Sequence, residues 1–136
     1  IYKLINKLNL ERNIKILGKV NEKDKNYLLN ISKLHVMPTV DEKRLLSVEG
    51  FGISYIEAAM AGLCSVATDN GGVSDAIINN ETGLLLKPDD DLYSSLKNIL
   101  SDSKKIKLFN LQAKKRALKD FNWDVVIEKY LNIIRN

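Results

Sequence analysis

Apolar side chains recur every three or four residues in some parts of this chain and form short continuous runs in others. The first pattern predicts helices, and the second predicts strands that are covered on both faces. The predicted helices cover residues 1–10, 22–33, 53–61, 73–78, 88–100 and 123–134, and one more places Ile106, Phe109, Ala113 and Ala117 on one face. The predicted strands cover residues 14–20, 34–37, 63–68 and 84–87.

Helices and strands alternate along the chain with short connections between them. This order is typical of parallel strands joined by right-handed crossover helices, so we predict an α/β fold. Asn21 followed three residues later by Asp24 resembles a helix N-cap with its partner. The helix that follows is expected to bury three apolar side chains, Tyr27, Leu28 and Ile31.

The size and composition of the chain are those of a soluble protein with one modest domain. It has 136 residues, and no apolar run approaches the roughly 20 residues that span a bilayer. Its single cysteine, Cys64, lies in an apolar segment and is expected to be a buried structural thiol in a cytoplasmic protein. Because the chain begins with Ile1 inside a predicted helix, we expect it to be a piece of a longer protein.

Positive charge is concentrated at the C-terminal end of the chain. From Lys104 onwards there are nine Lys or Arg residues and three Asp or Glu residues. A solvated helix face explains this excess, and so does attraction to an anionic acceptor or to the anionic surface of a membrane. Both explanations stay open at this point.

The predicted helix over residues 53–61 is apolar around nearly its whole circumference, yet it carries one carboxylate, Glu57. A carboxylate on a buried helix is costly unless it is paired or hydrogen-bonded. Glu57 is therefore expected either to form an ion pair with a lysine or arginine from elsewhere in the fold, or to face a pocket and bind the hydroxyl groups of a ribose. The helix alone does not decide between the two.

A glycine-spaced turn, E-G-F-G, leads into this helix. Gly50 and Gly52 allow the backbone to approach a ligand closely, and the amides at the start of the helix form an anion site suited to phosphate. Glu49 would repel a phosphate, so its presence indicates contact with a neutral hydroxylated group such as a sugar. Phosphate, ribose and a second sugar together describe a nucleotide sugar.

These motifs resemble, in order, the markers of the retaining glycosyltransferases of family 4, which have the two-Rossmann-domain GT-B architecture. E-G-F-G-I-S-Y-I-E resembles the family's motif of two glutamates separated by seven residues. Its other markers are similar to I-L-G-K-V, V-M-P, A-A-M-A-G, D-N-G-G-V-S-D, N-E-T-G-L-L-L-K-P-D and F-N-W. The resemblance implies that residues 1–136 form one incomplete domain, the Rossmann-like, C-terminal, donor-binding half of such an enzyme, without the N-terminal acceptor domain.

The resemblance also implies an activity and a set of site residues. The protein would move a sugar from a nucleotide diphosphate sugar to a saccharide or lipid-linked acceptor, with retention of configuration and with no metal or other cofactor. Glu49 would be the catalytic residue that binds the transferred sugar, and Glu57 would hold the ribose. The remaining donor contacts would be the backbone of Gly50, Phe51, Gly52 and Ile53 at the sugar and diphosphate, and Gly18 and Lys19 near the base.

The sequence departs from the family pattern in several places. The Arg and Lys that usually contact the diphosphate lie upstream of the region that this chain covers. Lys43 and Arg44 either touch the phosphates or belong to an ordinary solvated loop. Cys64 replaces a proline at the start of a strand, and Asp75 stands where a glutamate is common, so the local geometry at both positions is open.

Other functions fit the sequence less well. A dehydrogenase domain that binds NAD(P) is suggested by G-F-G-I-S-Y with Asp69 about 20 residues on, but Tyr55 replaces the third glycine. A non-catalytic nucleotide-sugar-binding module stays open for this chain alone. A serine nucleophile elbow lacks its final glycine, and His35, the single histidine, is expected in the core or at a strand edge. The basic C-terminal helices lack the interleaved aromatics of a nucleic-acid platform.

Overall fold

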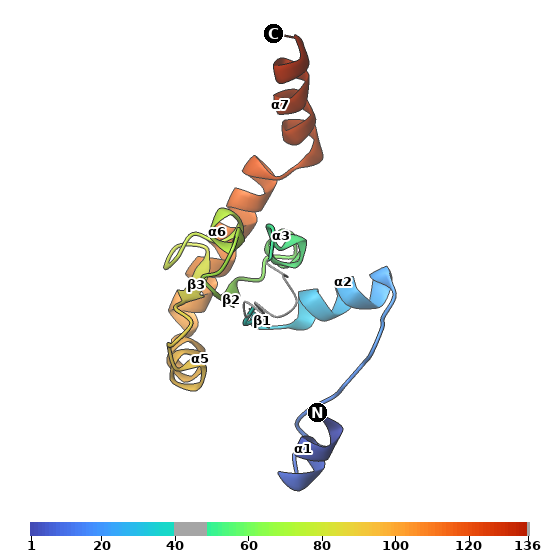
Figure 1. The fold of residues 1–136 in the computed structure, drawn as a ribbon, viewed down its shortest axis with the longest axis vertical. Helices are drawn as coiled ribbons and strands as arrows, with labels where there is room; N and C mark the ends of the chain where they lie inside the picture. The colour runs from blue at the N-terminus through green and yellow to red at the C-terminus, as the bar shows by residue number, and fades with distance from the viewer. Residues whose placement is uncertain (40–48, 136) are drawn as a thin grey trace.

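The computed structural model describes residues 1–39 and 49–135 of the chain. Helices and strands alternate through most of this part, as the pattern of apolar residues predicts (Figure 1). The elements are α1 (Tyr2–Lys7), α2 (Glu22–Ile31), β1 (His35–Met37), α3 (Ile53–Met60), β2 (Ser65–Thr68), α4 (Val73–Ala76), β3 (Gly83–Leu86), α5 (Leu92–Ser101), α6 (Ser103–Asp120) and α7 (Trp123–Arg135).

The three strands form one parallel sheet in the order β1-β2-β3. Ser65, at the start of the central strand, pairs with His35 on one side and with Gly83 on the other. All four residues of β2 are buried, as expected for a central parallel strand that is covered on both faces, although Ser65 and Thr68 are polar. The predicted α/β class with a parallel sheet is confirmed.

Different helices cover the two faces of the sheet. Val66 of the central strand packs with Ile99 of α5 and Phe109 of α6, whereas its neighbour Ala67 packs with Tyr55 of α3 and Val73 of α4. Successive side chains of a strand point to opposite faces, so these two clusters lie on opposite sides of β2. The sheet is therefore a central layer between two layers of helices, and loops lie at the ends of its strands.

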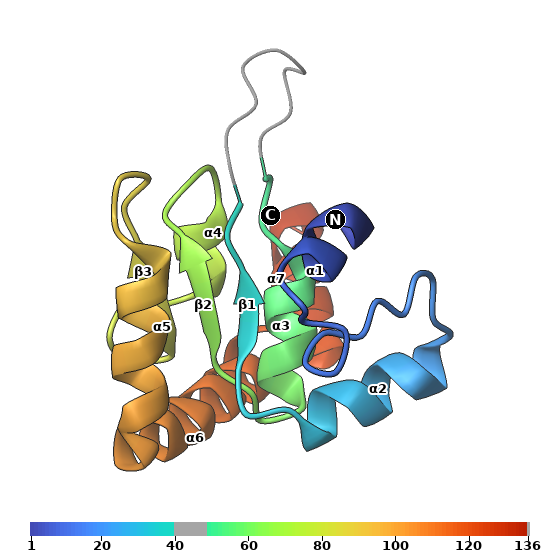
Figure 2. The ribbon, with the colours of Figure 1, turned by 90° about the horizontal axis from the view of Figure 1, so that it is seen from below.

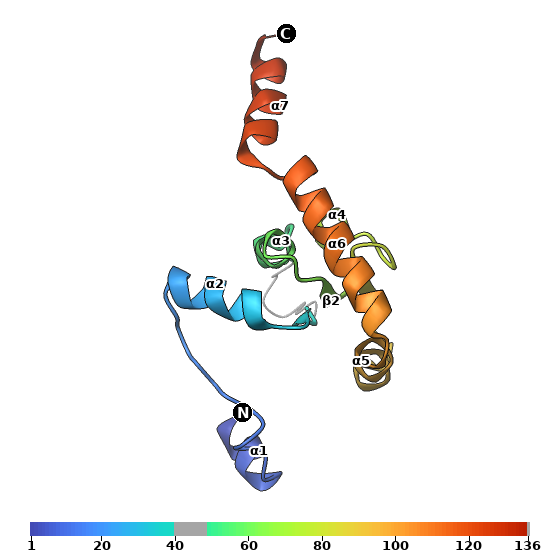
Figure 3. The same cartoon turned by 180° about the vertical axis from the view of Figure 1, so that it is seen from behind.

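Helix α6 joins the two layers. Its buried residues are the four that helical spacing predicts, Ile106, Phe109, Ala113 and Ala117. The first two pack into the α5 side of the core, and the two alanines pack against Ala59 of α3. The small alanine side chains allow α6 and α3 to approach closely. Seen from behind, α6 runs across the body of the molecule (Figure 3).

Two expectations about the N-terminal part of the chain are wrong. Residues 14–20 form no strand, and Ile14 and Leu17 are each 44% exposed. A strand needs a neighbour for its backbone hydrogen bonds, and this segment runs between α1 and α2, away from the sheet (Figure 1). Tyr27 and Ile31 are exposed rather than buried, because α2 projects from the body and no described element covers its outer side; Leu28 is half-buried.

The helix ends are formed by the residues that the sequence suggests. The side chain of Asn21 accepts a hydrogen bond from the Asp24 N–H at 2.8 Å, which confirms the predicted N-cap of α2. α5 begins later than predicted, because Asp91 caps it by accepting from the N–H groups of Tyr93 and Ser94. In the described part of the chain, no helix is long and apolar enough to cross a membrane.

Candidate functional site

Two glycine turns lie side by side at one edge of the sheet. The first, residues 49–52, leads into α3, and the second, residues 69–72, follows β2 and leads into α4. Both belong to connections that leave the carboxyl ends of parallel strands, the edge from which the loops rise in Figure 2. Ligands of open α/β sheets bind in the crevice outside these strand ends.

Gly52 sets the direction in which the first turn enters α3. It is the N-cap residue and has the left-handed conformation, with φ of 79°. A side chain here would also overlap with the ring of Tyr55. That tyrosine is buried, and its hydroxyl donates to the carbonyl oxygen of Met37 at 3.0 Å. The start of α3 is thereby tied to the end of β1.

The turn presents backbone amides that have no partner among the residues that the structure describes. Among residues 1–39 and 49–135, no residue accepts a hydrogen bond from the N–H groups of residues 50–53, and no side chain caps α3. Four orphan N–H groups at the positive end of a helix form a site for an anion. The geometry is compatible with the predicted anion site at the start of this helix, which stays a prediction.

The two glycine turns are in direct contact. The Gly72 N–H donates to the Glu49 carbonyl oxygen at 3.0 Å, and a Cβ at position 72 would overlap with the Gly50 carbonyl oxygen. Glycine is therefore required at position 72 by close packing of backbone on backbone. Through this contact, the turn at residues 69–72 (D-N-G-G) stabilises the conformation of the turn at residues 49–52 (E-G-F-G).

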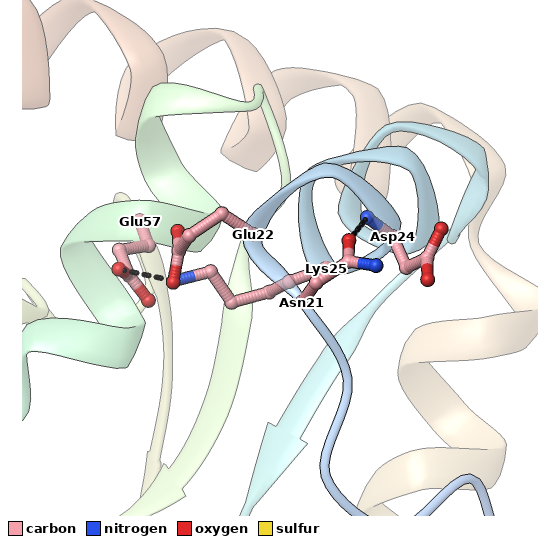
Figure 4. Close-up of polar contacts among 5 residues, drawn as sticks. All are labelled: Asn21, Glu22, Asp24, Lys25 and Glu57. Carbon is pink, nitrogen blue, oxygen red and sulfur yellow. Dashed lines mark hydrogen bonds and ion pairs between the residues drawn. The ribbon is translucent and has the colours of Figure 1, made fainter.

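Glu57 forms an ion pair, and its side chain is partly exposed. The expectation of a carboxylate on a fully buried helix face is therefore wrong. Oε1 of Glu57 lies 2.7 Å from Nζ of Lys25, and the side chain is 38% exposed (Figure 4). Lys25 also contacts Glu22 at 2.9 Å. These hydrogen bonds, to Glu57 first and Glu22 second, raise the pKa of Lys25 above its ordinary value.

The sequence predicts that α3 is buried around nearly its whole circumference, but in the structure part of the helix is exposed. Ile53 is 72% exposed, and Tyr55, Ala58 and Ala59 are the buried residues of the helix. Glu57 lies on the partly open side, so burial alone does not require a ligand for it. Of the two roles that the sequence leaves open, the ion pair is the one that the structure shows.

Glu57 nevertheless also lines a cavity. A groove of about 770 Å³ separates α3 from α2 and from the start of α7. Most of its walls are apolar, with Glu57 and three asparagines as polar groups, a composition typical of small-molecule sites. The lining residues are Asn26, Asn30, Phe51, Ile53, Ile56, Glu57, Met60, Ala61, Phe121, Asn122, Trp123 and Val126.

The structure brings only some of the predicted site residues together. Glu49 is half-buried beside the glycine turn, and its charge adds to the effect of burial in raising the pKa of Tyr55. Gly18 and Lys19 lie in the segment before α2, and no hydrogen bond in the described structure links them to α3. Lys43 and Arg44 lie outside the described residues.

Three supporting residues escape the sequence analysis. Lys25 is 32 positions from Glu57 in the chain, and no local pattern pairs them. Tyr55 occupies the place where a dinucleotide-binding turn has its third glycine, but here it anchors α3. Arg116 donates to the carbonyl oxygens of Asp75 and Ala76, while the Asp75 side chain is exposed. A basic residue on a basic helix gives no signal of such a role.

The other reactive side chains are structural. Burial raises the pKa of the Cys64 thiol to about 11, so it is protonated at neutral pH, as a structural thiol is expected to be. The Cys64 N–H donates to Asn110 at 2.8 Å, a bond that the family's usual proline could not make. His35 lies at the start of β1, and its Nδ1 is 2.9 Å from the Ser65 hydroxyl. Within the described ranges, no group of three acidic, histidine or cysteine residues could hold a metal.

Comparison with known proteins gives a family and a fold. The profile of the family "Glycosyl transferases group 1" matches residues 1–116. The 2-deoxystreptamine N-acetyl-D-glucosaminyltransferase of Niallia circulans is 28% identical over 127 residues, which is 92% of this chain and 31% of that protein. A GDP-mannose-dependent monoacylated alpha-(1-6)-phosphatidylinositol monomannoside mannosyltransferase of Corynebacterium glutamicum is 25% identical over 130 residues, 94% of this chain and 34% of that protein.

The solved structures that resemble this chain are GT-B glycosyltransferases. The crystal structure of Anabaena Alr3699/HepE in complex with UDP superposes with a TM-score of 0.84 at 20% identity, covering 98% of this chain and 35% of that one. This likeness shows the fold. The chain spans about a third of the length of the curated relatives described above.

Proposed function

Because the chain belongs to the glycosyl transferases group 1 family, we propose that the protein transfers a sugar from a nucleotide sugar to an acceptor, with this chain binding the donor. The observation that carries the proposal is a row of four amides, at residues 50–53, for which the described residues supply no acceptor; the row lies at the start of α3 and beside a carboxylate. Such amides suit a diphosphate, whose negative charge grows as it leaves the sugar.

We assign roles to the residues around this row. Glu49 binds the hydroxyl groups of the transferred sugar, and the backbone of residues 50–53 binds the diphosphate. Glu57 holds the ribose, exchanging one hydrogen bond with Lys25 for bonds to the two hydroxyls. Lys25 stays nearby, paired with Glu22. Gly18 and Lys19 are assigned to the base.

We further propose that the reaction retains the anomeric configuration and needs no metal. Oriented amides and cationic side chains stabilise the charge on the leaving diphosphate without a proton transfer. The amides of residues 50–53 supply part of this stabilisation, and the cations come from residues beyond the described ones. The acceptor is a saccharide or a lipid-linked saccharide, which the remainder of the complete protein binds.

A donor panel tests this activity. The complete protein is incubated with UDP-, GDP- and ADP-sugars, because one relative is named as GDP-mannose-dependent and one structural neighbour contains UDP. We expect release of one nucleoside diphosphate, and Glu49→Ala should lower kcat by at least about 100-fold with little loss of stability. Turnover that persists in Glu49→Ala would contradict the assigned role.

An NAD(P) reduction assay and the binding data from the donor panel separate the two alternatives. Reduction of NAD(P), followed by absorbance, would favour a dehydrogenase domain. The geometry argues against it, because Tyr55, which stands in place of the third glycine, is a buried side chain that donates to the Met37 carbonyl oxygen, whereas a dinucleotide-binding turn needs a glycine there for close packing of helix on strand. Tight binding of nucleotide sugars without any transfer would favour a non-catalytic module.

We also propose that the protein rests on an anionic membrane surface through the outer face of α6. The one acidic residue of the helix, Asp120, pairs with Arg116, and the exposed side chains of the outer face are lysines and leucines. They are Lys104, Lys107, Leu108, Leu111, Lys114, Lys115, Leu118 and Lys119. Interspersed leucines can enter the headgroup region while each lysine adds about 1 kcal/mol of attraction.

Vesicle sedimentation tests this surface. The complete protein should bind vesicles that contain phosphatidylglycerol and not vesicles of phosphatidylcholine alone, and salt should weaken the binding. Changing four lysines to Gln, at 104, 107, 114 and 115, should reduce binding about tenfold or more. The matched control changes the exposed Lys3, Lys7 and Lys23. Equal binding by both variants would contradict the proposal.

A further inference from the structure

The side chain between the two glycines of the first turn is held from outside the turn. Phe51 is half-buried, and its ring meets that of Phe121 edge to face, with centroids 5.4 Å apart. Phe121 lies at the junction of α6 and α7, 70 positions further along the chain. Since Gly50 and Gly52 add no side chains of their own, Phe51 is the side chain through which residues 50–52 can be fixed.

Phe121 is in turn covered by a cation. The guanidinium carbon of Arg116 lies 4.9 Å from the centre of the Phe121 ring, a distance at which a cation and an aromatic face attract each other. Arg116 also contacts Asp120, one turn further on α6, at 3.6 Å. The guanidinium plane is therefore fixed by its own helix as well as by the ring.

The same guanidinium fixes the end of α4. Its Nη1 donates to the carbonyl oxygen of Ala76 and its Nη2 to that of Asp75, both at 2.6 Å. These are the last two residues of α4, and a positive charge at the C-terminal end of a helix also interacts favourably with the helix dipole. Two parallel donors and a stacking plane are features of arginine that lysine lacks.

These contacts form a closed network around the proposed donor site. From Phe51 it runs through Phe121 and Arg116 to the end of α4, and then back along α4 to Gly72. The Gly72 N–H completes it by donating to the Glu49 carbonyl at 3.0 Å. The turn at residues 49–52 is thus held at both of its ends, by a backbone bond at Glu49 and by a ring contact at Phe51.

We propose that Arg116 and Phe121 are positioning residues, which hold the glycine turn in the shape that binds the donor's diphosphate. The inference rests on the proposed function for the identity of the ligand, but not for the ordering of the turn. A turn with two glycines in three residues loses much backbone entropy when it becomes ordered. If the protein orders it before the ligand arrives, the ligand does not bear that cost.

Three variants of the complete protein test this role. Phe121→Leu keeps an apolar side chain and removes the ring edge, and Arg116→Lys keeps the charge and removes the paired donors and the stacking. Phe109→Leu is the matched control, because Phe109 is buried in the cluster around Cys64 and Val66, away from the turn. Two quantities are measured: hydrogen exchange of the Gly72 and Tyr55 amides, which donate to the Glu49 and Gly52 carbonyl oxygens of the turn, and affinity for UDP and GDP.

Phe121→Leu and Arg116→Lys should each raise amide exchange at Gly72 and Tyr55 about three- to tenfold, the size expected from losing one aromatic or cation–π contact. The affinity for the diphosphate should fall by a similar factor. Phe109→Leu should lower Tm without changing exchange at the turn. If Phe121→Leu does not fold, Arg116→Lys carries the test.

The outcomes separate this inference from the proposed function. Exchange at Gly72 and Tyr55 that is the same in Arg116→Lys and Phe121→Leu as in the wild type would overturn the positioning role, whether or not nucleotides bind. Faster exchange in both variants supports the role even if the wild type binds no nucleoside diphosphate, a result that would contradict the proposed function alone.

Discussion

A methyl group would have opposite consequences at two neighbouring glycines of the candidate site. At Gly72 it would overlap with the carbonyl oxygen of Gly50, so Gly72→Ala should separate the two turns and cost about 1–3 kcal/mol of stability. At Gly50 no atom of the described residues lies within 4 Å of an added Cβ. Gly50→Ala should therefore leave stability unchanged or raise it by about 0.4–1 kcal/mol.

The same pair of variants reports on ligand binding. Gly50→Ala should weaken binding of a nucleoside diphosphate about tenfold or more, because the methyl group occupies the space through which the ligand approaches the backbone. Thermal unfolding and a nucleotide titration on both variants check this. Loss of stability in Gly50→Ala without a change in affinity would contradict the placement of the donor.

His35 makes the stability of the protein depend on pH. Burial lowers its pKa below the ordinary 6.5, and the charge of Glu57 offsets only part of that effect. Between the lowered pKa and 6.5 the unfolded chain binds more protons than the folded one, so the free energy of unfolding falls as the pH drops below 6.5. Denaturant unfolding at several pH values should show this loss, and His35→Gln should reduce it. If the free energy of unfolding of His35→Gln depended on pH as steeply as that of the wild type, His35 would not be the cause of this pH dependence.

At the scale of elements, the side chain of Asn110 joins α6 to the start of β2. Its oxygen accepts the hydrogen bond of the Cys64 N–H, a buried donor with no second partner in the described structure. Asn110→Ala should cost about 1–3 kcal/mol, because that donor is left unsatisfied. Gln112→Ala is the matched control on the same helix, since the buried Gln112 Oε1 has no partner among the described residues. Equal costs in urea unfolding would argue against this role for Asn110.

How much of each element the sequence predicts depends on whether the element is defined by its own side chains. Helical spacing identifies all four buried residues of α6, and the apolar run around Val66 identifies β2. Residues 14–20 have an equally suitable pattern but form no strand, because a strand also requires a neighbouring backbone. No pattern within a single segment contains that information.

For the candidate site too, the sequence predicts the local features but not the contacts between distant segments. The glycine turn and its open amides follow from local sequence, since a turn and a helix start are local structures. The partner of Glu57 does not, because Lys25 belongs to another helix and only the fold brings them within 2.7 Å. Arg116 and Phe121 are recognisable only once α4, α6 and the turn are in place.

At the scale of the whole molecule, the described chain is a layered body with two projections. The sheet and its covering helices form the body, while α1 with its connection to α2 extends from one side and α7 from the other (Figure 1). The apolar side chains of α7 are largely exposed, with Ile127 at 50% and Ile134 at 76%. Exposed apolar surface of this kind marks contact surfaces. The glycine turns belong to the body, at the carboxyl edge of its sheet, so the donor site proposed for this family member lies on the body and not on either projection.

The central claim is that the four open amides at the start of α3 bind the donor's diphosphate. Its most direct test is an amide NMR titration of the complete protein with UDP and with GDP. The account predicts saturable shifts at Gly50, Phe51, Gly52 and Ile53 with at least one of the two, and weaker binding in Glu57→Gln, about tenfold or more from the loss of a charged hydrogen bond. No shift at these four amides with either nucleotide, or shifts confined to another part of the protein, would contradict it.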